Sequence, residues 1–357
     1  MMTSPFAVTA FVHHPPTYNH RSGMYPLAEA LGARTVFYTD RWRQIQRHSW
    51  RLGAWARRQA VSWYGSQWTY LLPLLDEWRM AQRMARCDVA HFLFGEFAAP
   101  RHAHGFRKKA RALVGTFHAS ARRLPNVLKG YRCLATFDAV TLMSETQRPY
   151  FEKQGVPADK LTVILHGVDT GYFTPALNRS ARPEEPLRGL LVGSTERDHE
   201  MMNNILHRLP DGILDLTILT ATEQRQYYYP KNVPHATFPE HMDDASLLEA
   251  YRAADLLIMP MLDCTANNAV LEAMACGTPV MANRIGGIPE YVDSSCNVVL
   301  DEHSADAWVD LLVYWYERRD QLEAMRPRVR QWAERFDWAK VAPRYLAAYE
   351  KALTMAS

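Results

Sequence analysis

Hydrophobic residues gather in short runs along the chain, and most runs are followed by a polar loop and a stretch with helical spacing. The first run, Phe6–Val12, precedes a polar loop and a helix over about Tyr25–Leu31. Such runs predict strands that are buried on both faces, and their alternation with helices predicts parallel sheets. Further strands are predicted at Thr35–Tyr38, Val89–Phe94, Ala112–Phe117, Leu190–Gly193, Leu216–Leu219, Ala236–Phe238, Leu256–Met259 and Pro279–Ala282.

The most informative pattern begins where the apolar strand Leu257–Met261 runs into a small polar loop. Asn267 or Asn268 is placed to cap the following helix, and Gly277 is placed to end it. Backbone amides at a helix N-terminus lack intrahelical partners and carry partial positive charge. We therefore expect this helix to bind a diphosphate over the amides of residues 266–269. Glu272, one turn further, is within reach of a hydroxyl of the same ligand.

Two segments of this region, Leu271-Glu-Ala-Met-Ala-Cys-Gly-Thr-Pro-Val280 and Gly286-Gly-Ile-Pro-Glu290, resemble the donor-binding signature of family 4 retaining glycosyltransferases. A strand that ends in Ser144-Glu145 and a Gly167-Val-Asp169 hinge are also similar to that family. The resemblance covers nearly the whole chain and is strongest from about 137 to 292. It implies an α/β protein of the GT-B fold, with two Rossmann-like domains whose parallel sheets face each other across a central cleft.

The length of 357 residues suits two α/β domains. We expect an N-terminal acceptor-binding domain over residues 1–169 and a linker over 170–188, which is rich in proline, serine and charge. A nucleotide-sugar-binding domain is expected over 189–335. The resemblance implies that the last segment, 336–357, is a helix that crosses back to the N-terminal domain.

In the family, two glutamates eight positions apart bind the donor, and the second contacts the nucleotide ribose. Glu272 falls on the second position, whereas Cys264 occupies the first. The family also has an arginine and a lysine that neutralise the leaving diphosphate, and Ser194 and His199 stand at those positions. Arg197 lies between them and is the candidate replacement. Taken together, the helix N-terminus, the family positions and the first loop give these candidate contacts to the nucleotide sugar: Gly23, Ser194, Arg197, His199, Cys264, Ala266, Asn267, Asn268 and Glu272.

His118 matches a strand-end histidine that in family members lies near the donor sugar, where an imidazole can position or polarise a hydroxyl. Glu96, at another strand end, is the carboxylate expected to contact an acceptor hydroxyl, and Glu145 is the next candidate. Ser22 and His13 flank the first loop and are expected on the acceptor side.

No Asp-x-Asp motif occurs in the sequence, and the histidines of the first loop have no carboxylate or cysteine beside them. We therefore expect no metal site and no cofactor. The resemblance implies that the anomeric configuration is retained, with the acceptor oxygen attacking on the face that the diphosphate leaves.

No run of eighteen apolar residues predicts a membrane-spanning helix, and Met1–Val12 lacks the basic start of a signal peptide. The five cysteines have no Cys-x-x-Cys spacing, which argues against a disulfide framework or a zinc site. A reducing cytoplasm fits these features best.

The formal net charge of +3 hides an asymmetry. Residues 1–150 hold 21 Lys and Arg against 8 Asp and Glu, whereas residues 151–357 hold 20 against 30. The section 41–70 interleaves arginine with tryptophan and has no acidic residue, which is typical of a segment at an anionic membrane surface. A solvated helix with some buried tryptophans is the alternative, and nothing resembles a nucleic-acid-binding module. The expected membrane residues are Arg41, Trp42, Arg43, Arg47, Trp50 and Arg51.

Together these features predict a retaining glycosyltransferase that moves a sugar from a UDP- or GDP-sugar to a glycolipid or growing surface glycan at the inner face of the membrane. The residues at positions 194, 199 and 264 favour a second hypothesis, a catalytically impaired subunit that binds nucleotide sugar or glycan. A GT-B sugar-nucleotide epimerase is a third; it would need no acceptor, and the Arg/Trp section argues against it.

Overall fold

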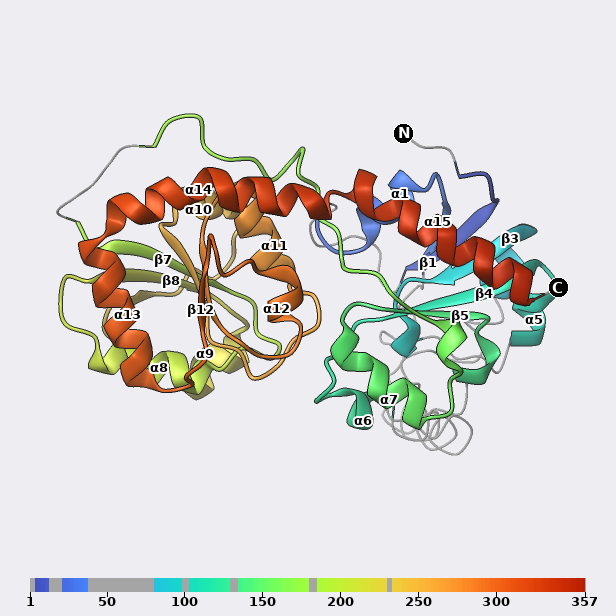
Figure 1. Ribbon diagram of the computed structural model, residues 1–357, viewed down its shortest axis with the longest axis horizontal. Helices are drawn as coiled ribbons and strands as arrows, with labels where there is room; N and C mark the ends of the chain where they lie inside the picture. Colours follow the sequence, from blue (N-terminus) through green and yellow to red (C-terminus); the bar gives the residue numbers. More distant parts are fainter. Residues whose placement is uncertain are drawn as a thin grey trace, which may run out of the picture. The chain divides into compact units, whose positions relative to one another are not determined.

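A computed structural model of the protein describes residues 4–12, 21–37, 80–97, 103–128, 134–179, 185–229 and 233–356. The chain divides into two compact units (Figure 1), of which the second runs from Val168 to Asp337. The first unit contains the described residues up to Gly167 and from Trp338 onward. His13 and the predicted membrane segment 41–51 lie outside the described residues. In the described part of the chain, no helix is long and apolar enough to cross a membrane.

The first unit is built on a six-stranded sheet with the order β2-β1-β3-β4-β5-β6, and all of its pairings are parallel. Every residue of β1 is buried, which explains its continuous apolar run. The strands are β1 (Val8–Val12), β2 (Arg34–Phe37), β3 (Cys87–Phe92), β4 (Ala110–Phe117), β5 (Ala139–Leu142) and β6 (Leu161–Val163). The helices are α1 (Tyr25–Ala30), α5 (Ala103–Arg107), α6 (Leu124–Val127), α7 (Arg148–Lys153) and α15 (Trp338–Met355).

The second unit has a six-stranded parallel sheet with the order β12-β11-β10-β7-β8-β9. Its strands are β7 (Leu187–Val192), β8 (Leu214–Leu219), β9 (Ala236–Thr237), β10 (Leu256–Met259), β11 (Val280–Asn283) and β12 (Val298–Leu300). Its helices are α8 (His199–Arg208), α9 (Thr222–Tyr228), α10 (Asp244–Ala253), α11 (Asn268–Ala275), α12 (Ile288–Tyr291), α13 (Ala305–Glu317) and α14 (Arg319–Ala333).

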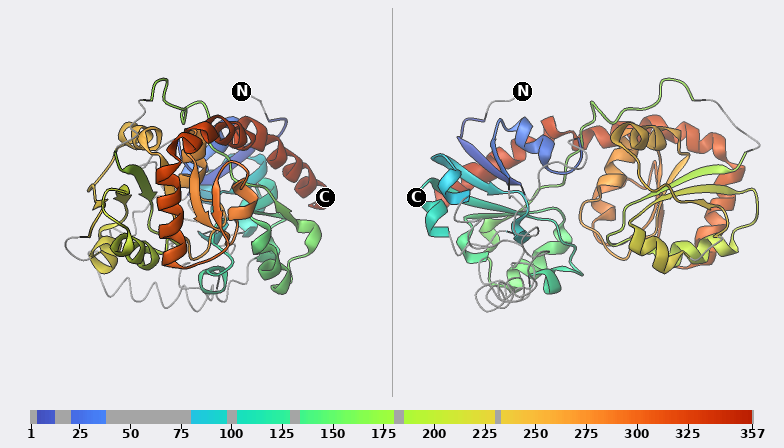
Figure 2. Two further views of the ribbon diagram at one scale, coloured as in Figure 1. Left: turned by 60° about the vertical axis from the view of Figure 1, so that its left-hand side comes forward. Right: turned by 180° about the vertical axis from the view of Figure 1, so that it is seen from behind.

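Helices cover both faces of the second sheet. Figures 1 and 2 show α10, α11 and α14 on one side of the strands, and α8 and α9 on the other. The strand order reverses between β7 and β10, so the crevice at their carboxyl ends is the expected ligand site of this unit. Two α/β units with parallel six-stranded sheets confirm the predicted fold class. Strand β12 was not among the predicted strands.

Part of the segment that the sequence suggested as a linker is packed against the second unit. Phe173 is fully buried, and its carbonyl oxygen accepts a hydrogen bond from Arg330 Nη1 at 2.7 Å. Val168 donates its backbone amide to Phe336 at 2.8 Å, and the Thr170 hydroxyl is hydrogen-bonded to Asp337. The chain therefore enters and leaves the second unit at neighbouring residues.

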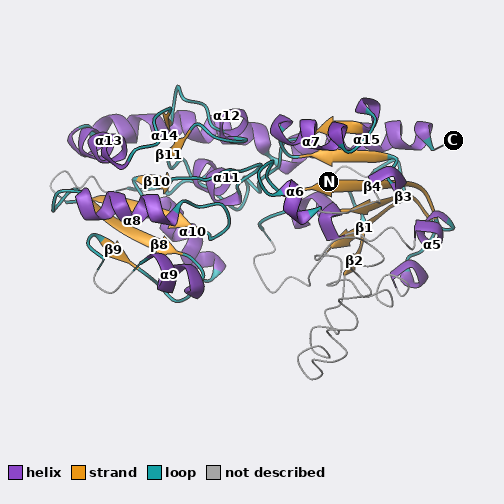
Figure 3. Ribbon diagram, turned by 90° about the horizontal axis from the view of Figure 1, so that it is seen from below, coloured by secondary structure: helices purple, strands orange, loops and turns teal. Residues whose placement is uncertain are grey.

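Helix α15 packs on the first sheet through a buried polar contact. Figure 3 shows this helix running alongside β4. Hydrogen bonds of 2.7 Å join His91 Nδ1 to the Tyr349 hydroxyl and His91 Nε2 to Thr116 Oγ1. The ring of Tyr345 lies 5.6 Å from that of His91. Because these residues come from α15 and from two strands, the contact sets how the C-terminal helix sits on the sheet.

Burial makes this contact sensitive to acid. It lowers the pKa of His91 to about 3, and it does the same for His166, which also lies in the first unit. An unfolded histidine titrates near 6.5. Below that pH, the unfolded chain binds protons at these histidines that the folded chain does not. Their contribution to the free energy of unfolding is therefore fully present above about pH 6.5 and is lost as the pH falls toward 3.

We predict that moving from pH 7 to pH 5 lowers the free energy of unfolding by about 2 kcal/mol for each of these histidines. The loss should be about 2 kcal/mol smaller in His91→Gln than in the wild type, as measured by urea titration at both pH values. His207, exposed on α8, provides the control variant His207→Gln, which should keep the wild-type loss. An equal loss in His91→Gln would contradict the assignment.

Candidate functional site

The N-terminus of α11 follows the carboxyl end of β10, at the point where the strand order of the second sheet reverses. Asn267 precedes the helix in an extended conformation, and its Oδ1 accepts a hydrogen bond from the Val270 amide at 3.4 Å. Asn267 is thus the cap, and Asn268 is the first helical residue. Gly277 ends the helix region with a φ of +73°, as predicted. The first-turn amides lack intrahelical acceptors, which suits this end of α11 to an anion.

Arg197 joins the end of β7 to the start of α11. Its Nε and Nη2 donate to the Val192 carbonyl at 3.0 and 2.9 Å, and its Nη1 donates to the Thr195 carbonyl at 2.7 Å. Nη2 also donates to Asn267 Oδ1 at 3.1 Å. A Cβ on Gly193, whose φ is +101°, would lie 2.6 Å from Nη2, so glycine is needed where the guanidinium passes.

The guanidinium of Arg197 stays charged although Arg197 is half-buried. Burial lowers its pKa to about 10, while the nearby Tyr251, Cys264 and Glu272 act in the opposite direction. At neutral pH the site therefore contains one fixed positive charge next to the cap of α11. Its hydrogen bonds to the Val192 and Thr195 carbonyls and to Asn267 Oδ1 hold the side chain in place, so Arg197 is part of the wall of the site.

Ser194 and His199, which stand where the resemblance expects cations, are held by neighbouring side chains. Ser194 Oγ lies 3.0 Å from Thr220 Oγ1. His199 is buried, and a hydrogen bond of 2.8 Å joins its Nδ1 to the Tyr229 hydroxyl. Burial, reinforced by Arg197, lowers the pKa of His199 to about 4. His199 is therefore neutral at physiological pH and does not replace the expected lysine as a cation.

Cys264 is a buried, protonated thiol in the position of the first glutamate. Burial raises its pKa to about 12. The neighbouring Asp263 accepts the Cys264 amide through Oδ1 at 2.8 Å. The Gly286-Gly287 turn packs on this loop, because Gly287 donates its amide to the Cys264 carbonyl at 2.8 Å. A Cβ on Gly286 would overlap the Asp263 carboxylate. The turn therefore shapes the loop that leads to Asn267.

Glu272 lies on α11 and is held by a residue that the sequence analysis did not select. It is 5% exposed, and its Oε2 accepts a hydrogen bond of 2.8 Å from the hydroxyl of Tyr251 on α10. Burial raises the pKa of Tyr251 well above its ordinary value, so the hydroxyl remains the donor. A buried tyrosine is expected to have a hydrogen-bond partner. The sequence pattern does not reveal which residue that partner is.

In the first unit, Glu96, which the sequence suggested as an acceptor contact, binds backbone amides through one of its carboxylate oxygens. It is 4% exposed, and its Oε1 accepts the backbone amides of His118 and Ala119, the latter at 2.7 Å. Glu96 thus holds the turn that follows β4. This contact also positions His118, whose Nε2 is joined to the Leu93 carbonyl at 2.7 Å and whose ring stacks on Phe94 at 4.4 Å. The half-buried His118 ring has a fixed orientation at the strand end.

Glu145 is exposed and forms an ion pair with Arg148 at 2.7 Å, and this hydrogen bond lowers the pKa of Glu145. The neighbouring Gln147 is buried and was missed. Its Oε1 accepts the Met143 amide at 2.7 Å, and its Nε2 donates to the Phe117 carbonyl at 3.1 Å. Gln147 therefore ties together the carboxyl ends of β4 and β5.

Ser22 and Gly23 lie just before α1 and are partly buried, and Gly23 has a φ of +67°. In the second unit, Ala266 and Asn268 are also partly buried at the start of α11. The structure thus brings Arg197, Asn267, Cys264 and Glu272 together around that helix. The expected site residues of the first unit lie after β3, at the carboxyl ends of β4 and β5, and before α1.

Two family models match this chain. "Glycosyltransferase Family 4" matches residues 24–172, and "Glycosyl transferases group 1" matches residues 176–318. The chain belongs to this glycosyltransferase family.

Curated relatives include the D-inositol 3-phosphate glycosyltransferases of Paenarthrobacter aurescens and Nocardia farcinica. The first is 27% identical over 227 residues, which cover 56% of this chain and 54% of that protein. The second is 30% identical over 242 residues, which cover 59% and 51%. The match therefore spans about half the length of these relatives.

Solved structures support the GT-B fold. Anabaena HepE in complex with UDP-glucose superposes with a TM-score of 0.66 at 13% identity, covering 96% of this chain and 98% of that chain. Sucrose-phosphate synthase from Thermosynechococcus elongatus gives a TM-score of 0.66 at 16% identity, covering 98% and 100%. At such identities the likeness shows the fold alone.

The Gly286 turn can be tested with a matched pair of glycines. Gly286 and Gly212 both have a positive φ, but a Cβ on Gly212 would meet nothing within 4 Å. Gly212→Ala should cost about 1 to 2 kcal/mol of stability through backbone strain alone. Gly286→Ala adds a clash with Asp263 and Cys264, for a total of about 2 to 5 kcal/mol. Equal losses in urea titrations would show that the close approach does not constrain the turn.

Proposed function

We propose that this protein transfers a sugar from a nucleoside diphosphate sugar to a glycolipid or growing surface glycan at the inner face of a membrane. The observation that carries the proposal is the N-terminus of α11 at the reversal point of the second sheet, with Glu272 and the charged Arg197 beside it. Parallel α/β sheets bind nucleotides at such points. HepE, which shares the fold, was solved with UDP-glucose, and a UDP-sugar is therefore the first donor to test.

In this proposal the diphosphate rests on the amides of residues 266–269, where a helix N-terminus supplies roughly half a positive charge. Arg197 adds a full charge that is fixed through Asn267. Preorganised charge of this kind stabilises a leaving diphosphate as its bond to the sugar carbon breaks. Glu272 accepts hydrogen bonds from the ribose, and His118 positions a hydroxyl of the donor sugar.

The chemistry that fits this arrangement needs no nucleophile from the protein. The acceptor oxygen attacks the anomeric carbon on the face that the diphosphate leaves, and a phosphate oxygen takes the acceptor proton. The bond to the diphosphate breaks as the new glycosidic bond forms, and the configuration is retained because the acceptor oxygen enters on the face that the diphosphate leaves. We propose that no metal takes part, in keeping with the lack of an Asp-x-Asp motif in the sequence.

A second candidate function is a subunit that binds nucleotide sugar without turnover. Three observations favour it: Arg197 is engaged with protein oxygens, His199 is neutral at physiological pH, and Cys264 replaces a carboxylate with a protonated thiol. Both functions predict nucleotide binding. Transfer or slow hydrolysis of the bound sugar distinguishes the first from the second.

We predict that UDP binds selectively over GDP and ADP, with and without magnesium, in calorimetry. Glu272→Gln should weaken this binding by about 1 to 3 kcal/mol, because a hydrogen bond to a charged group is replaced by one to a neutral amide. Glu249→Gln, an exposed change on α10, should leave the affinity unchanged. Wild-type affinity in Glu272→Gln would remove Glu272 from the site, and no nucleotide binding at all would refute the proposed function.

Membrane association is supported among the described residues by a basic hollow at the amino-terminal edge of the first sheet. The hollow has a volume of about 460 Å³ and lies at the edge opposite to the strand ends that carry His118. Arg107 is neutralised by Asp138, and Arg111 is paired with Asp88 at 3.2 Å. The residues that line the hollow are Ala7, Arg86, Cys87, Asp88, Arg107, Lys108, Lys109, Ala110 and Arg111. The excess of cations suits anionic headgroups.

We predict that replacing Arg86, Lys108 and Arg111 with alanine reduces sedimentation with phosphatidylglycerol vesicles by roughly 100-fold, at about 1 kcal/mol per basic residue. Phosphatidylcholine vesicles should bind neither protein. The control replaces three exposed cations of the same unit, Lys153, Lys340 and Lys351, which gives the same change in net charge. An equal loss in the control would mean that net charge, rather than the hollow, determines binding.

A further inference from the structure

Tyr251 is joined to α11 at two points. Its hydroxyl donates to Glu272 Oε2 at 2.8 Å, and its backbone carbonyl accepts a hydrogen bond of 2.6 Å from the Thr278 hydroxyl, just beyond the end of α11. Its ring is fully buried and meets the ring of Phe173 edge to face at 6.1 Å. Packing on the ring and the hydrogen bond of the hydroxyl hold the side chain in one orientation, while the carbonyl contact holds the backbone that carries it.

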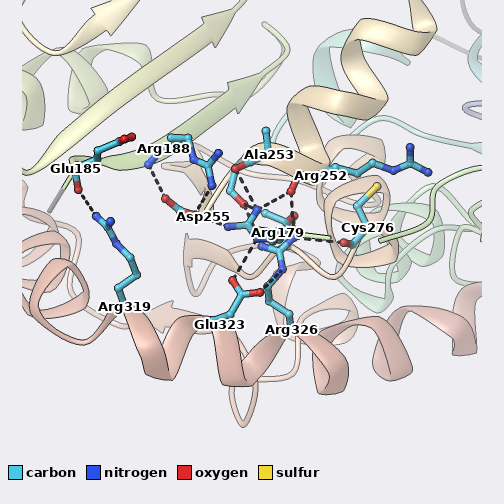
Figure 4. Close-up of polar contacts among 12 residues, drawn as sticks. Arg179, Glu185, Arg188, Arg252, Ala253, Asp255, Cys276, Arg319, Glu323 and Arg326 are labelled. Carbon is cyan, nitrogen blue, oxygen red and sulfur yellow. Dashed lines mark hydrogen bonds and ion pairs between the residues drawn. The ribbon is translucent and has the colours of Figure 1, made fainter. Parts of the chain in front are cut away.

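Two arginines, Arg179 and Arg326, fix the end of α10 that carries Tyr251 (Figure 4). We call this pair the arginine clasp. Arg179 Nη1 donates to the carbonyl of Arg252 at 2.6 Å and to those of the next two residues at 3.1 Å. Arg326 donates to the Ala254 carbonyl at 3.0 Å and to Thr278 Oγ1 at 3.1 Å. Cations stabilise the carbonyl end of a helix. The clasp therefore holds α10 in place relative to α11.

The structure thus supplies Glu272 with a rigid hydrogen-bond donor. A carboxylate that accepts one hydroxyl loses its freedom of rotation, yet it keeps its negative charge and further lone pairs on both oxygens. A cation in place of Tyr251 would neutralise the group and compete with a ligand. A neutral donor orients the carboxylate without neutralising its charge.

We propose that Tyr251 is a positioning residue for the nucleotide: its hydroxyl orients the Glu272 carboxylate to accept hydrogen bonds from the ribose hydroxyls of the donor. This inference rests on the proposed function, because it assumes that the ligand is a ribonucleotide. Preorganisation of this kind improves affinity by removing the cost of ordering the side chain on binding.

The test measures discrimination between UDP and 2′,3′-dideoxy-UDP, which lacks the hydroxyls that Glu272 would contact. Wild-type protein should bind UDP at least about 10-fold more tightly, as expected for one charged hydrogen bond. In Tyr251→Phe, which keeps the ring, we expect this ratio to fall at least 3-fold through weaker binding of UDP, with the affinity for dideoxy-UDP unchanged. In a Glu272→Gln background, Tyr251→Phe should lower the ratio no further.

Tyr349→Phe is the matched control, because it also removes a buried tyrosine hydroxyl, in this case the one joined to His91 of the first unit. It should lower the melting temperature but keep the wild-type ratio. An unchanged ratio in Tyr251→Phe, or an equal fall in Tyr349→Phe, would overturn the inference while leaving nucleotide binding intact. Equal affinity of the wild-type protein for UDP and 2′,3′-dideoxy-UDP would also overturn it. Failure of wild-type protein to bind either nucleotide would overturn the proposed function as well.

Discussion

The hydrogen bond between Arg197 and Asn267 is the contact on which the candidate site depends. It joins the loop after β7 to the helix that follows β10, the two strands between which the order of the second sheet reverses. Arg197 also holds the Val192 carbonyl, and Asn267 also caps α11. One half-buried guanidinium therefore fixes both walls of the crevice. Such a charge is tolerated only while its hydrogen-bond partners remain, so the loops cannot rearrange independently.

Features encoded by neighbouring residues could be predicted from the sequence. The strands are buried on both faces and appear as continuous apolar runs, as in β1 and β10. The cap at Asn267 and the helix end at Gly277 need only local geometry. Strand β12 was missed because its three residues, Val298–Leu300, are too short a run to stand out. The family resemblance added the GT-B fold and the position of Glu272.

Contacts between distant residues could not be predicted in this way. The rule that ligands bind at strand ends selected Glu96 and His118, but the Glu96 carboxylate turns inward to accept the amides of the turn after β4. Likewise, the position of His199 in the sequence suggests a cation, whereas its burial beside Tyr229 keeps it neutral. Tyr251, which donates to Glu272, lies 21 residues earlier and on another helix. Burial and packing decide each of these roles.

The fixed charge of Arg197 bears on the choice between an enzyme and a binding subunit. A cation that is present before and after the reaction stabilises bound diphosphate in every state, and such uniform binding alone does not accelerate transfer. Charge on the leaving oxygen nevertheless grows as the bond to the sugar breaks, so a field that is already oriented stabilises the transition state more than the ground state. The loss of mobile cations therefore leaves a route to catalysis open. It also means that turnover, rather than nucleotide affinity, separates the two functions.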